Sequence, residues 1–447
     1  MSNGEGHSIY FLGIGGIGMS ALARYYHSLG YTIAGYDLTP SPLTKLLENE
    51  GMAIHYEDNP ELLPALIDLV IYTPAVPSDL KEFEALRQRD IPILKRAEAL
   101  GKISKDHFTI AVAGTHGKTT TTAMIAHILN QCGIDTTAFI GGIANNFESN
   151  LLLGKKKNSV LVVEADEFDH SFLQLHPDIS VIGSIDADHL DIYGDKESLM
   201  ESFNAFAKLT KRNVIVREGL DIEAWNRLSF GFGDGCNYQI TLGNSGNGYT
   251  LFYIKGEGQD NLMVIIPLAG VHNVLNATAA FIVARRIGLP RNRIVEALHT
   301  FQGVKRRFDI RVSNDNYCYI DDYAHHPTEI RACLQAIRDF YPGKRLTLVF
   351  QPHLYSRTRD FMDEFAEVLA LADELILLGI YAAREEPIPG VSSESLLDKI
   401  QMTNKRLVAK AKLIKLIESE KPELLVTMGA GDIDRLVEPL EKMIATW

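Results

Sequence analysis

Two glycine-rich segments place the strongest constraint on how this chain folds. GIGGIG at residues 13–18 follows the apolar run SIYFL and precedes a segment with helical periodicity, and GTHGKTT at residues 114–120 lies between FTIAVA and another such segment. A glycine-rich turn that joins a strand to a helix presents backbone N–H groups to a phosphate. The sequence therefore predicts two phosphate-binding units in one chain.

The first loop carries a complete dinucleotide-binding fingerprint. Its glycines have the G-x-G-x-x-G spacing, and an acidic residue ends the next apolar run about 20 residues later. The loop amides would hold a pyrophosphate, and the acid would contact a sugar hydroxyl. The fingerprint does not distinguish NAD from other nucleotides with a pyrophosphate, and a tight turn without a ligand is the alternative. Its residues are Gly13, Gly15, Gly16, Gly18 and Asp37.

The second loop is a shortened Walker A motif, with Val112 where the standard motif has a glycine. The glycines let backbone amides turn toward phosphate, Lys118 supplies a positive charge, and the Thr119 hydroxyl can bind Mg²⁺. These features predict an ATP site, and the alternative is a threonine-rich turn with an incidental lysine. The predicted nucleotide-binding residues are Gly114, Thr115, His116, Gly117, Lys118, Thr119 and Thr120.

Two acidic segments follow predicted buried strands and are candidates for metal binding. Mg²⁺ prefers oxygen ligands. Glu164, at the end of an apolar run, is the strongest candidate, and we expect His189 to act with it rather than to be an ordinary polar loop residue. The acidic neighbours in the two segments are Asp166, Glu167, Asp186, Asp188 and Asp191.

Short apolar runs alternate with helical segments along the chain, which is the pattern of β-α-β units and parallel sheets. A length of 447 residues exceeds what one hydrophobic core usually organises. We expect three α/β domains: a Rossmann-like domain at residues 1–105, a P-loop ATPase-like domain with a mixed sheet at residues 106–308, and a second Rossmann-like domain at residues 309–447. Gly, Asn and Tyr with weak alternation predict antiparallel hairpins at residues 228–268.

Composition argues against several functional classes. A net charge of -13 disfavours nucleic-acid binding, and the basic run GKKKN at residues 154–158 is interpreted as a solvated loop. No apolar stretch approaches the roughly 18 residues of a membrane span, and from the first residues we expect no secretion signal. The four cysteines are scattered, which predicts neither a disulfide framework nor a zinc site. We expect a cytoplasmic protein, a monomer or weak dimer, that binds neither nucleic acid nor membranes.

Eight segments, in chain order, resemble motifs of the Mur ligase family. The resemblance implies ATP-dependent amide bond formation in the synthesis of peptidoglycan precursors. ATP, with Mg²⁺, would phosphorylate the lactyl carboxylate of UDP-N-acetylmuramate, and the amine of L-alanine would attack the acyl phosphate. The first loop would then hold the UDP-sugar and the second loop ATP. The segments are GIGGIGMSALA, GTHGKTTTT, VVEADEFD, DADHLDIYG, GVHNVLNATAA, FQGVKRRFD, DDYAHHPTE and QPHLYSRT.

The same resemblance assigns roles to single residues. Lys118 would bind the β- and γ-phosphates, and Mg²⁺ would be held by Thr119, Glu164 and His189. The other residues at the nucleotide would be His272, Asn273, Asn276, Arg307 and Asp322, and those near L-alanine and the muramoyl carboxylate would be Tyr323, His325, His353 and Arg357. The catalytic set implied is Lys118, Glu164, His189, Arg307, His325 and Arg357.

Simpler structural interpretations exist for two of these motifs. Asn273 is a possible helix N-cap. DDYAHHPTE is a possible helix start, with Pro327 in the first turn and Glu329 favoured by the helix dipole. We expect DDYAHHPTE to serve both purposes.

Position 354 departs from the family pattern, because relatives often carry an arginine in this run and this chain has Leu354. The carboxylate of the amino acid would then be bound by Arg357 alone or by a residue elsewhere. Three alternative functions stay open: a recycling ligase that adds a tripeptide to the same UDP-sugar, an NAD-dependent dehydrogenase that leaves the second loop unexplained, and a nucleotide-dependent binding protein without catalysis.

Overall fold

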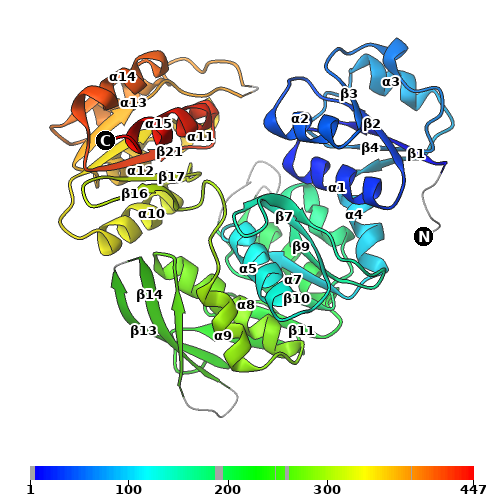
Figure 1. Ribbon diagram of the computed structural model, residues 1–447, viewed down its shortest axis with the longest axis horizontal. Helices are drawn as coiled ribbons and strands as arrows, with labels where there is room; N and C mark the ends of the chain where they lie inside the picture. The colour runs from blue at the N-terminus through cyan, green and yellow to red at the C-terminus, as the bar shows by residue number, and fades with distance from the viewer. Residues whose placement is uncertain (1–5, 187–194, 247, 257–260, 384) are drawn as a thin grey trace. The chain divides into compact units, whose positions relative to one another are not determined.

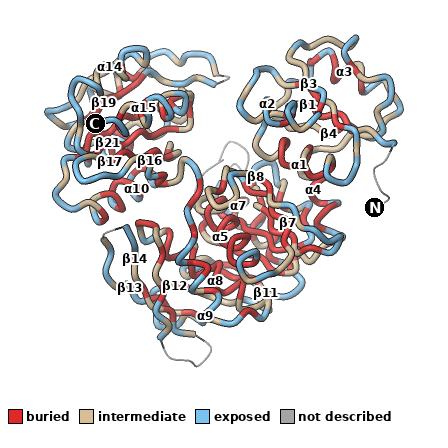
Figure 2. The backbone as a smooth tube through the Cα atoms, viewed as in Figure 1, coloured by how far each residue is buried: buried red, intermediate tan, exposed pale blue. Residues whose placement is uncertain are grey.

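The computed structural model describes residues 6–186, 195–246, 248–256, 261–383 and 385–447. Three β-sheets follow one another along the chain, each with its own helices (Figure 1). Buried residues concentrate on the strands and on the helix faces that cover them (Figure 2). The expected class, three α/β domains with a mixed central sheet, is confirmed. In the described ranges no helix has the length and apolar character needed to cross a membrane.

The N-terminal sheet consists of five parallel strands in the order β3-β2-β1-β4-β5. The chain proceeds from β1 first to one side and then to the other, so the point where the strand order reverses lies at β1. Ligands of doubly wound sheets bind at such a point. The strands are β1 (Ser8–Leu12), β2 (Thr32–Tyr36), β3 (Ala53–His55), β4 (Leu69–Tyr72) and β5 (Ile93–Lys95).

Local sequence signals explain where the N-terminal helices begin and end. Ser41 caps α2 by accepting a hydrogen bond from Thr44 N at 3.1 Å, with Pro42 as the first helical residue. Gly30, at φ 90°, follows the end of α1, where the left-handed backbone favours glycine. The helices are α1 (Ile17–Ser28), α2 (Pro42–Asn49), η1 (Pro60–Leu62), α3 (Lys81–Arg87) and α4 (Arg96–Lys105).

The central sheet has the strand order β15-β14-β13-β12-β11-β10-β6-β9-β7-β8. Its middle is parallel, and β8 pairs antiparallel with β7. The strands are β6 (Thr109–Ala113), β7 (Thr136–Ala144), β8 (Ser149–Leu152), β9 (Val160–Ala165), β10 (Ile179–Ile182), β11 (Asn213–Arg217), β12 (Arg227–Gly231), β13 (Tyr238–Gly246), β14 (Tyr249–Gly256) and β15 (Leu262–Ile266).

The prediction of antiparallel hairpins throughout residues 228–268 is wrong at its start. β12 pairs parallel with both β11 and β13. The Glu218 carboxylate accepts hydrogen bonds from Phe232 N at 2.6 Å and Gly233 N at 2.7 Å, and so holds the turn that follows β12. This contact joins residues distant in sequence, which a local pattern does not reveal. β13 and β14 are neighbours in the sheet and adjacent in the chain, as in a hairpin (Figure 1).

Helix α5 forms although its first turns contain four consecutive threonines. β-branched residues weaken isolated helices, but burial of residues 119–129 outweighs this preference. The helices of the central segment are α5 (Lys118–Gln131), η2 (Phe168–Gln174), α7 (Lys196–Lys208), α8 (Val271–Arg286) and α9 (Arg291–His299).

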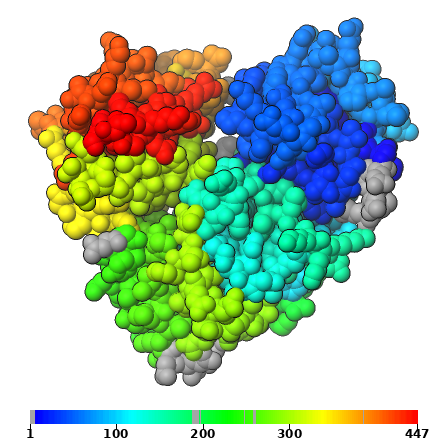
Figure 3. Space-filling model, viewed as in Figure 1, coloured from blue at the N-terminus to red at the C-terminus, as the bar shows by residue number. Residues whose placement is uncertain are grey.

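Helix α1 packs on β7 and β8 of the central sheet. Arg24 Nη1 donates to Ser149 Oγ at 2.8 Å, and Asn150 Nδ2 donates to Ile17 O at 2.7 Å. The blue N-terminal residues and the cyan residues of the central segment touch in the space-filling view (Figure 3). These contacts bring the first loop toward the segment that carries the second.

The C-terminal sheet has the order β16-β17-β21-β18-β19-β20, with only β16 antiparallel to its neighbour. Its strands are β16 (Asp309–Ser313), β17 (Cys318–Asp322), β18 (Leu346–Phe350), β19 (Glu374–Leu377), β20 (Lys405–Leu407) and β21 (Leu424–Met428). Its helices are α10 (Pro327–Phe340), α11 (Tyr355–Asp360), α12 (Met362–Leu369), α13 (Ser393–Lys399), α14 (Lys410–Glu420), η3 (Asp432–Leu436) and α15 (Val437–Ile444).

The chain divides into two compact units. The first consists of Met1–Thr241, Tyr253–Val264 and Leu275–Phe301, and contains both glycine-rich loops. The second consists of Leu242–Phe252, Ile265–Val274 and Gln302–Trp447. The predicted domain limits at residues 105 and 308 stay predictions.

Candidate active site

The first glycine-rich loop is held by the acid that the sequence predicts to contact a sugar. Gly15 N donates to Asp37 Oδ2 at 2.7 Å. A methyl group at Gly15 would lie only 2.6 Å from Thr44 Cγ2, so only glycine fits there. Gly13 has φ 81°, in the left-handed region that glycine favours. Both positions therefore need glycine for the tight path of the backbone.

The loop leads into α1 without a side-chain cap. Gly16 occupies the N-cap position and makes no side-chain hydrogen bond to the helix. The first N–H groups of a helix have no partner within it and carry partial positive charge, which suits an anion. The N-terminus of α1 is therefore suited to bind a phosphate.

The second loop turns through two left-handed glycines, Gly114 at φ 137° and Gly117 at φ 79°. The end of β10 supports it: Thr115 N donates to Ser184 O at 3.2 Å, and His116 N donates to Ser184 Oγ at 2.8 Å. Asp186 N also donates to Thr115 Oγ1 at 2.7 Å. Ser184, which the sequence analysis did not single out, thus fixes the loop from outside.

Lys118 begins α5 and is held within the loop. Its Nζ donates to Gly114 O at 2.8 Å and to both carboxylate oxygens of Glu167, at 2.9 and 2.8 Å. Burial lowers the pKa of Lys118, but the nearby carboxylates of Glu167 and Asp166 outweigh this effect and leave the pKa above its ordinary value. Lys118 is therefore a charged, well-ordered ammonium.

A cavity of about 330 Å³ adjoins both loops. Arg96 lies between Gly18 of the first loop and Asp166. A methyl group added at Gly18 would be 3.1 Å from Arg96 Nη1, and Arg96 Nη2 donates a hydrogen bond to Asp166 Oδ2 at 3.0 Å. The cavity thus brings cations and carboxylates together between the two loops. Its lining includes Gly16, Gly18, Thr73, Arg96, Lys118, Gly141, Glu164 and Asp166.

The predicted metal ligands are only partly described. Glu164 faces the cavity, and its Oε1 accepts a hydrogen bond from Gly141 N at 2.6 Å. Thr119 is buried in the first turn of α5. His189 lies outside the described residues, as do Asp188 and Asp191. Within the described ranges, no three His, Cys, Asp or Glu side chains gather in a metal-binding cluster.

Two asparagines of α8 have different surroundings. Asn276 lies against the second loop, because a methyl group at Gly117 would be 2.6 Å from its Oδ1. Asn273 Nδ2 donates to Ala269 O at 2.8 Å. The interpretation of Asn273 as an N-cap is wrong, since Asn273 is the third residue of α8.

In the second unit, Arg307 lies among groups that the sequence analysis names. Its guanidinium lies 5.1 Å from the ring centre of Tyr323, and its Nη1 is 4.0 Å from Glu329 Oε1. Burial and the charge of Arg307 lower the pKa of His272 to about 4. Asp322 accepts hydrogen bonds from Phe308 N at 2.6 Å and Ala324 N at 2.7 Å, which holds it at the end of β17.

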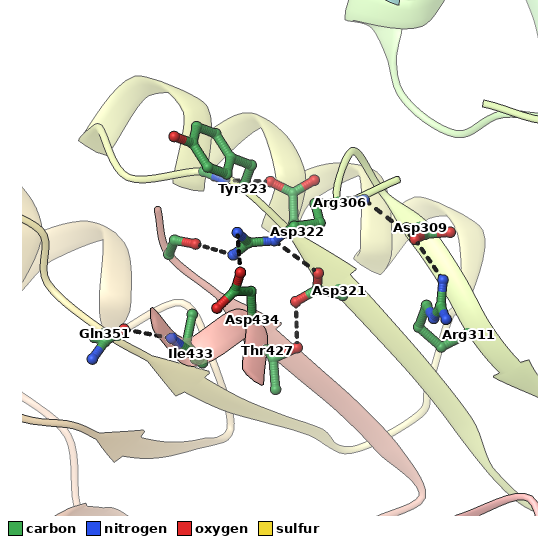
Figure 4. Close-up of polar contacts among 12 residues, drawn as sticks. Arg306, Asp309, Arg311, Asp321, Asp322, Tyr323, Gln351, Thr427, Ile433 and Asp434 are labelled. Atoms are coloured by element: carbon green, nitrogen blue, oxygen red, sulfur yellow. Dashed lines mark hydrogen bonds and ion pairs between the residues drawn. The ribbon is translucent and has the colours of Figure 1, made fainter. Parts of the chain in front are cut away.

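Arg306, absent from the predicted set, anchors the segment that carries Arg307 (Figure 4). Its Nε donates to Asp321 Oδ2 at 3.2 Å, and its Nη2 donates to Gly429 O at 2.6 Å. Burial raises the pKa of Asp321 to about 6 although Arg306 opposes the shift. The two adjacent arginines have the same chemistry, so the sequence offers no signal that one is a structural anchor.

Two predicted histidines and Arg357 also lie together in the second unit. The rings of His325 and His353 are 6.0 Å apart, and Arg357 Nη1 donates to His353 Nδ1 at 3.2 Å. Burial lowers the pKa of both histidines, that of His353 to about 4. Near neutral pH both imidazoles are therefore uncharged. The helix start predicted at Pro327 is confirmed, with Glu329 completing the cap of α10.

Leu354, the expected departure from the family pattern, has a left-handed backbone with φ 72° at the start of α11. Ser356 N donates to Glu385 Oε2 at 2.9 Å, which fixes the same turn from a distant segment. A residue other than glycine is uncommon at such a φ. The turn at Leu354 is therefore held by a contact from a distant segment. Arg357, three residues later, still donates a hydrogen bond to His353.

The chain matches three sequence profiles of one family. "Mur ligase family, catalytic domain" matches residues 8–108, "Mur ligase middle domain" residues 112–284, and "Mur ligase, glutamate ligase domain" residues 306–431. The chain is 48% identical to the UDP-N-acetylmuramate--L-alanine ligase of Flavobacterium psychrophilum over 98% of both chains. It is 46% identical to that of Cytophaga hutchinsonii over 97% of this chain and 96% of the relative.

Solved structures agree in fold. The UDP-N-acetylmuramate-alanine ligase from Thermotoga maritima superposes with a TM-score of 0.86 at 29% identity, over 98% of this chain and 99% of the other. A murein peptide ligase from Psychrobacter arcticus has a TM-score of 0.72 at 24% identity, over 99% of each chain. From the profiles and the near full-length relatives, this chain belongs to the Mur ligase family.

Proposed function

We propose that this protein is an ATP-dependent ligase that joins L-alanine to the lactyl carboxylate of UDP-N-acetylmuramate. The carboxylate oxygen attacks the γ-phosphorus of ATP and ADP leaves. The amine nitrogen of L-alanine then attacks the carbonyl carbon of the acyl phosphate, inorganic phosphate leaves, and the nitrogen loses a proton. Phosphorylation is needed because a carboxylate is anionic and lacks a good leaving group.

The cavity shared by the two glycine-rich loops carries this proposal. A reaction between a UDP-sugar and ATP needs one pyrophosphate site and one triphosphate site with a path between them, and the cavity is lined by Gly18 of the first loop and Lys118 of the second. A dehydrogenase would use only the first loop. Both loops belong to the first compact unit.

The residues of the first unit have the roles that such a reaction requires. The amides of residues 13–18 would bind the pyrophosphate of the UDP-sugar, and Asp37 would turn from Gly15 toward the ribose. The amides of residues 114–120 and the Lys118 ammonium would bind the phosphates of ATP, and Asn276 would lie near the adenine. Preorganised positive charge stabilises the transferring phosphoryl group.

Mg²⁺ fits this site, because Glu164 offers a carboxylate at the cavity and Thr119 a hydroxyl at the loop, and oxygen is the donor that Mg²⁺ prefers. With His189, these residues would hold the ion, which would neutralise phosphate charge. In the second unit, Arg307 and Asp322 would bind the nucleotide with His272 and Asn273. Tyr323, His325, His353 and Arg357 would bind L-alanine and orient the muramoyl carboxylate.

The choice of L-alanine over a preformed tripeptide rests on the relatives. Those from Flavobacterium psychrophilum and Cytophaga hutchinsonii are named for L-alanine, and both align along nearly the whole chain.

A reducing, cytoplasmic compartment is part of the proposal. It is supported by the four cysteines, which are free, and by the proposed use of ATP as a substrate.

The test is phosphate release from ATP with Mg²⁺ and UDP-N-acetylmuramate, with and without L-alanine. We expect turnover only when both co-substrates are present. Lys118→Ala should lower kcat by about 10²–10³, as expected when a preorganised charge is removed. Lys157→Ala, an exposed lysine of the 154–158 loop, is the matched control and should leave turnover unchanged.

Other results would point to the alternatives. Turnover with the tripeptide but not with L-alanine would assign the recycling reaction. Absence of turnover with both acceptors would contradict the ligase proposal and favour a nucleotide-binding protein without catalysis.

A further inference from the structure

Glu167 binds the Lys118 ammonium through both oxygens of its carboxylate. Its side chain is 1% exposed, and its two oxygens accept hydrogen bonds from Lys118 Nζ at 2.9 and 2.8 Å. In the sequence, Glu167 is only one of several acidic neighbours of a candidate metal ligand. In the structure it is the direct partner of Lys118, 49 residues earlier in the chain.

The arrangement restricts Lys118 without removing it from the cavity. An ammonium has three N–H donors, and among the described residues these meet the two Glu167 oxygens and Gly114 O, so a phosphate oxygen would share or displace one of them. Lys118 still contributes to the lining of the cavity, where the phosphates of ATP are proposed to lie. A lysine side chain has several rotatable bonds, and fixing them in advance removes an entropic cost from reaching the transition state of phosphoryl transfer.

The turn that carries Glu167 is itself fixed from other elements. Asp169 and His170 both have left-handed backbones, with φ 52° and 53°, which cost energy in residues other than glycine. The turn keeps this shape because Asp166 pairs with Arg96 at 3.0 Å and His170 Nδ1 lies 2.9 Å from Ser202 Oγ. These contacts hold the turn on both sides of Glu167.

A buried ion pair is by itself weak evidence of a stabilising role, because desolvation offsets most of the attraction. The same segment offers a comparison. Asp169 pairs with Lys95 at 2.9 Å, but both side chains are more than two-fifths exposed, and neither lines the cavity. The buried pair joins the turn to Lys118 at the start of α5, and the exposed pair joins it to Lys95 at the end of β5. Only the buried pair touches the cavity.

We infer that Glu167 is a positioning residue, which orients the Lys118 ammonium for phosphoryl transfer. The inference rests on the proposed function and adds a residue to its machinery. Glu167 is not among the residues that line the cavity, so its effect on the substrates is through Lys118. Stabilisation of the charge on the transferring phosphoryl group depends on the exact position of the ammonium. Removal of Glu167 should therefore raise the energy of the transition state more than it weakens ground-state binding of ATP.

The experiment measures kcat and the KM for ATP in the phosphate-release assay for Glu167→Gln, Glu167→Asp and Asp169→Asn. Glu167→Gln keeps the shape and a hydrogen-bond acceptor but removes the charge. We expect kcat to fall about 10–100-fold while the KM for ATP changes less than about 3-fold. Glu167→Asp, which restores the carboxylate on a shorter side chain, should recover part of kcat. Asp169→Asn should match the wild type.

Thermal unfolding and ADP binding accompany the kinetics, because a variant could lose activity by unfolding. A variant that unfolds at the wild-type temperature and binds ADP, but has a low kcat, supports the inference. An unchanged kcat per folded molecule would overturn it and leave Glu167 as a structural partner. A lower KM for ATP with unchanged kcat would also overturn it, since Glu167 would then only compete with ATP for Lys118.

The outcome is separable from that of the proposed function. If the wild type turns over with both co-substrates and Glu167→Gln turns over equally fast, the inference alone fails. If the wild type does not release phosphate with any acceptor, the proposed function fails and the positioning role fails with it.

Discussion

At the scale of the residue, neighbours decide which charges the second unit carries. Arg306 is bound by Asp321 and by the Gly429 carbonyl, whereas Arg307 lies near Glu329. Burial lowers the pKa of His272, and the charge of Arg307 adds to this effect. Both guanidinium groups lie 5.1 Å from the ring centre of Tyr323, but their carboxylate partners differ: Asp321 for Arg306 and Glu329 for Arg307. Such differences have measurable consequences for stability.

His272 should make the stability of the second unit depend on pH. Its pKa is about 4 in the folded protein and about 6.5 when the chain is unfolded. Between these values the unfolded state binds more protons, so stability rises with pH over this window. The contribution is fully present above pH 6.5 and is lost as the pH falls toward 4. It amounts to at most about 3–4 kcal/mol, since one pKa unit corresponds to about 1.4 kcal/mol.

The measurement compares urea unfolding of the wild type and His272→Gln from pH 4 to pH 8. The difference in free energy of unfolding should move in favour of the wild type between pH 4 and 6.5 and stay constant above. A difference that does not vary with pH would show that His272 does not contribute in this way.

At the scale of the element, a glycine lies at each end of helix α5, and the two have similar backbone angles but different surroundings. Gly117 precedes the helix at φ 79°, and Gly133 follows it at φ 82°. A methyl group at Gly117 would lie 2.6 Å from Asn276 Oδ1, whereas one at Gly133 would have no atom within 4 Å. The pair separates backbone strain from crowding of the phosphate loop.

Gly117→Ala and Gly133→Ala should each lose about 1–2 kcal/mol of stability, because alanine is strained at positive φ. Only Gly117→Ala should also weaken nucleotide binding, by about 10-fold or more, since the loop must move away from Asn276. Calorimetric titration with ADP checks this. Equal affinities of the two variants would mean that the crowding at Gly117 does not reach the phosphates.

At the scale of the whole molecule, the chain consists of two compact units, so unfolding need not be a single transition. The sequence has two tryptophans, Trp225 in the first unit and Trp447 in the second. Trp225 is 87% exposed, whereas Trp447 packs edge-on against Tyr317 with ring centres 5.1 Å apart. Trp447 is thus a local reporter of the second unit.

Calorimetry of the ligand-free protein should resolve more than one transition. In a Trp225→Phe variant, the fluorescence of Trp447 should follow only one of them. The substitution is mild because the side chain is exposed. One calorimetric transition that coincides with the fluorescence change would contradict independent unfolding of the units.

The sequence determined those parts of the protein that depend on residues close together in the chain. The two glycine-rich loops, the strand and helix around each, and the start of α10 at Pro327 follow from spacing, glycine conformations and capping. The parallel N-terminal sheet follows from the alternation of apolar runs with helical segments. The assignment to the Mur ligase family also needed only ordered motifs.

Tertiary structure decided the pairings between distant residues. It joined Lys118 to Glu167 across 49 positions and Arg96 to Asp166 across 70, and it made β12 and β13 parallel where the local pattern predicted a hairpin. No spacing rule selects one carboxylate from VVEADEFD for one lysine. The choice depends on which side chains share a buried space, where an unpaired charge is costly, and that space exists only after the chain has folded.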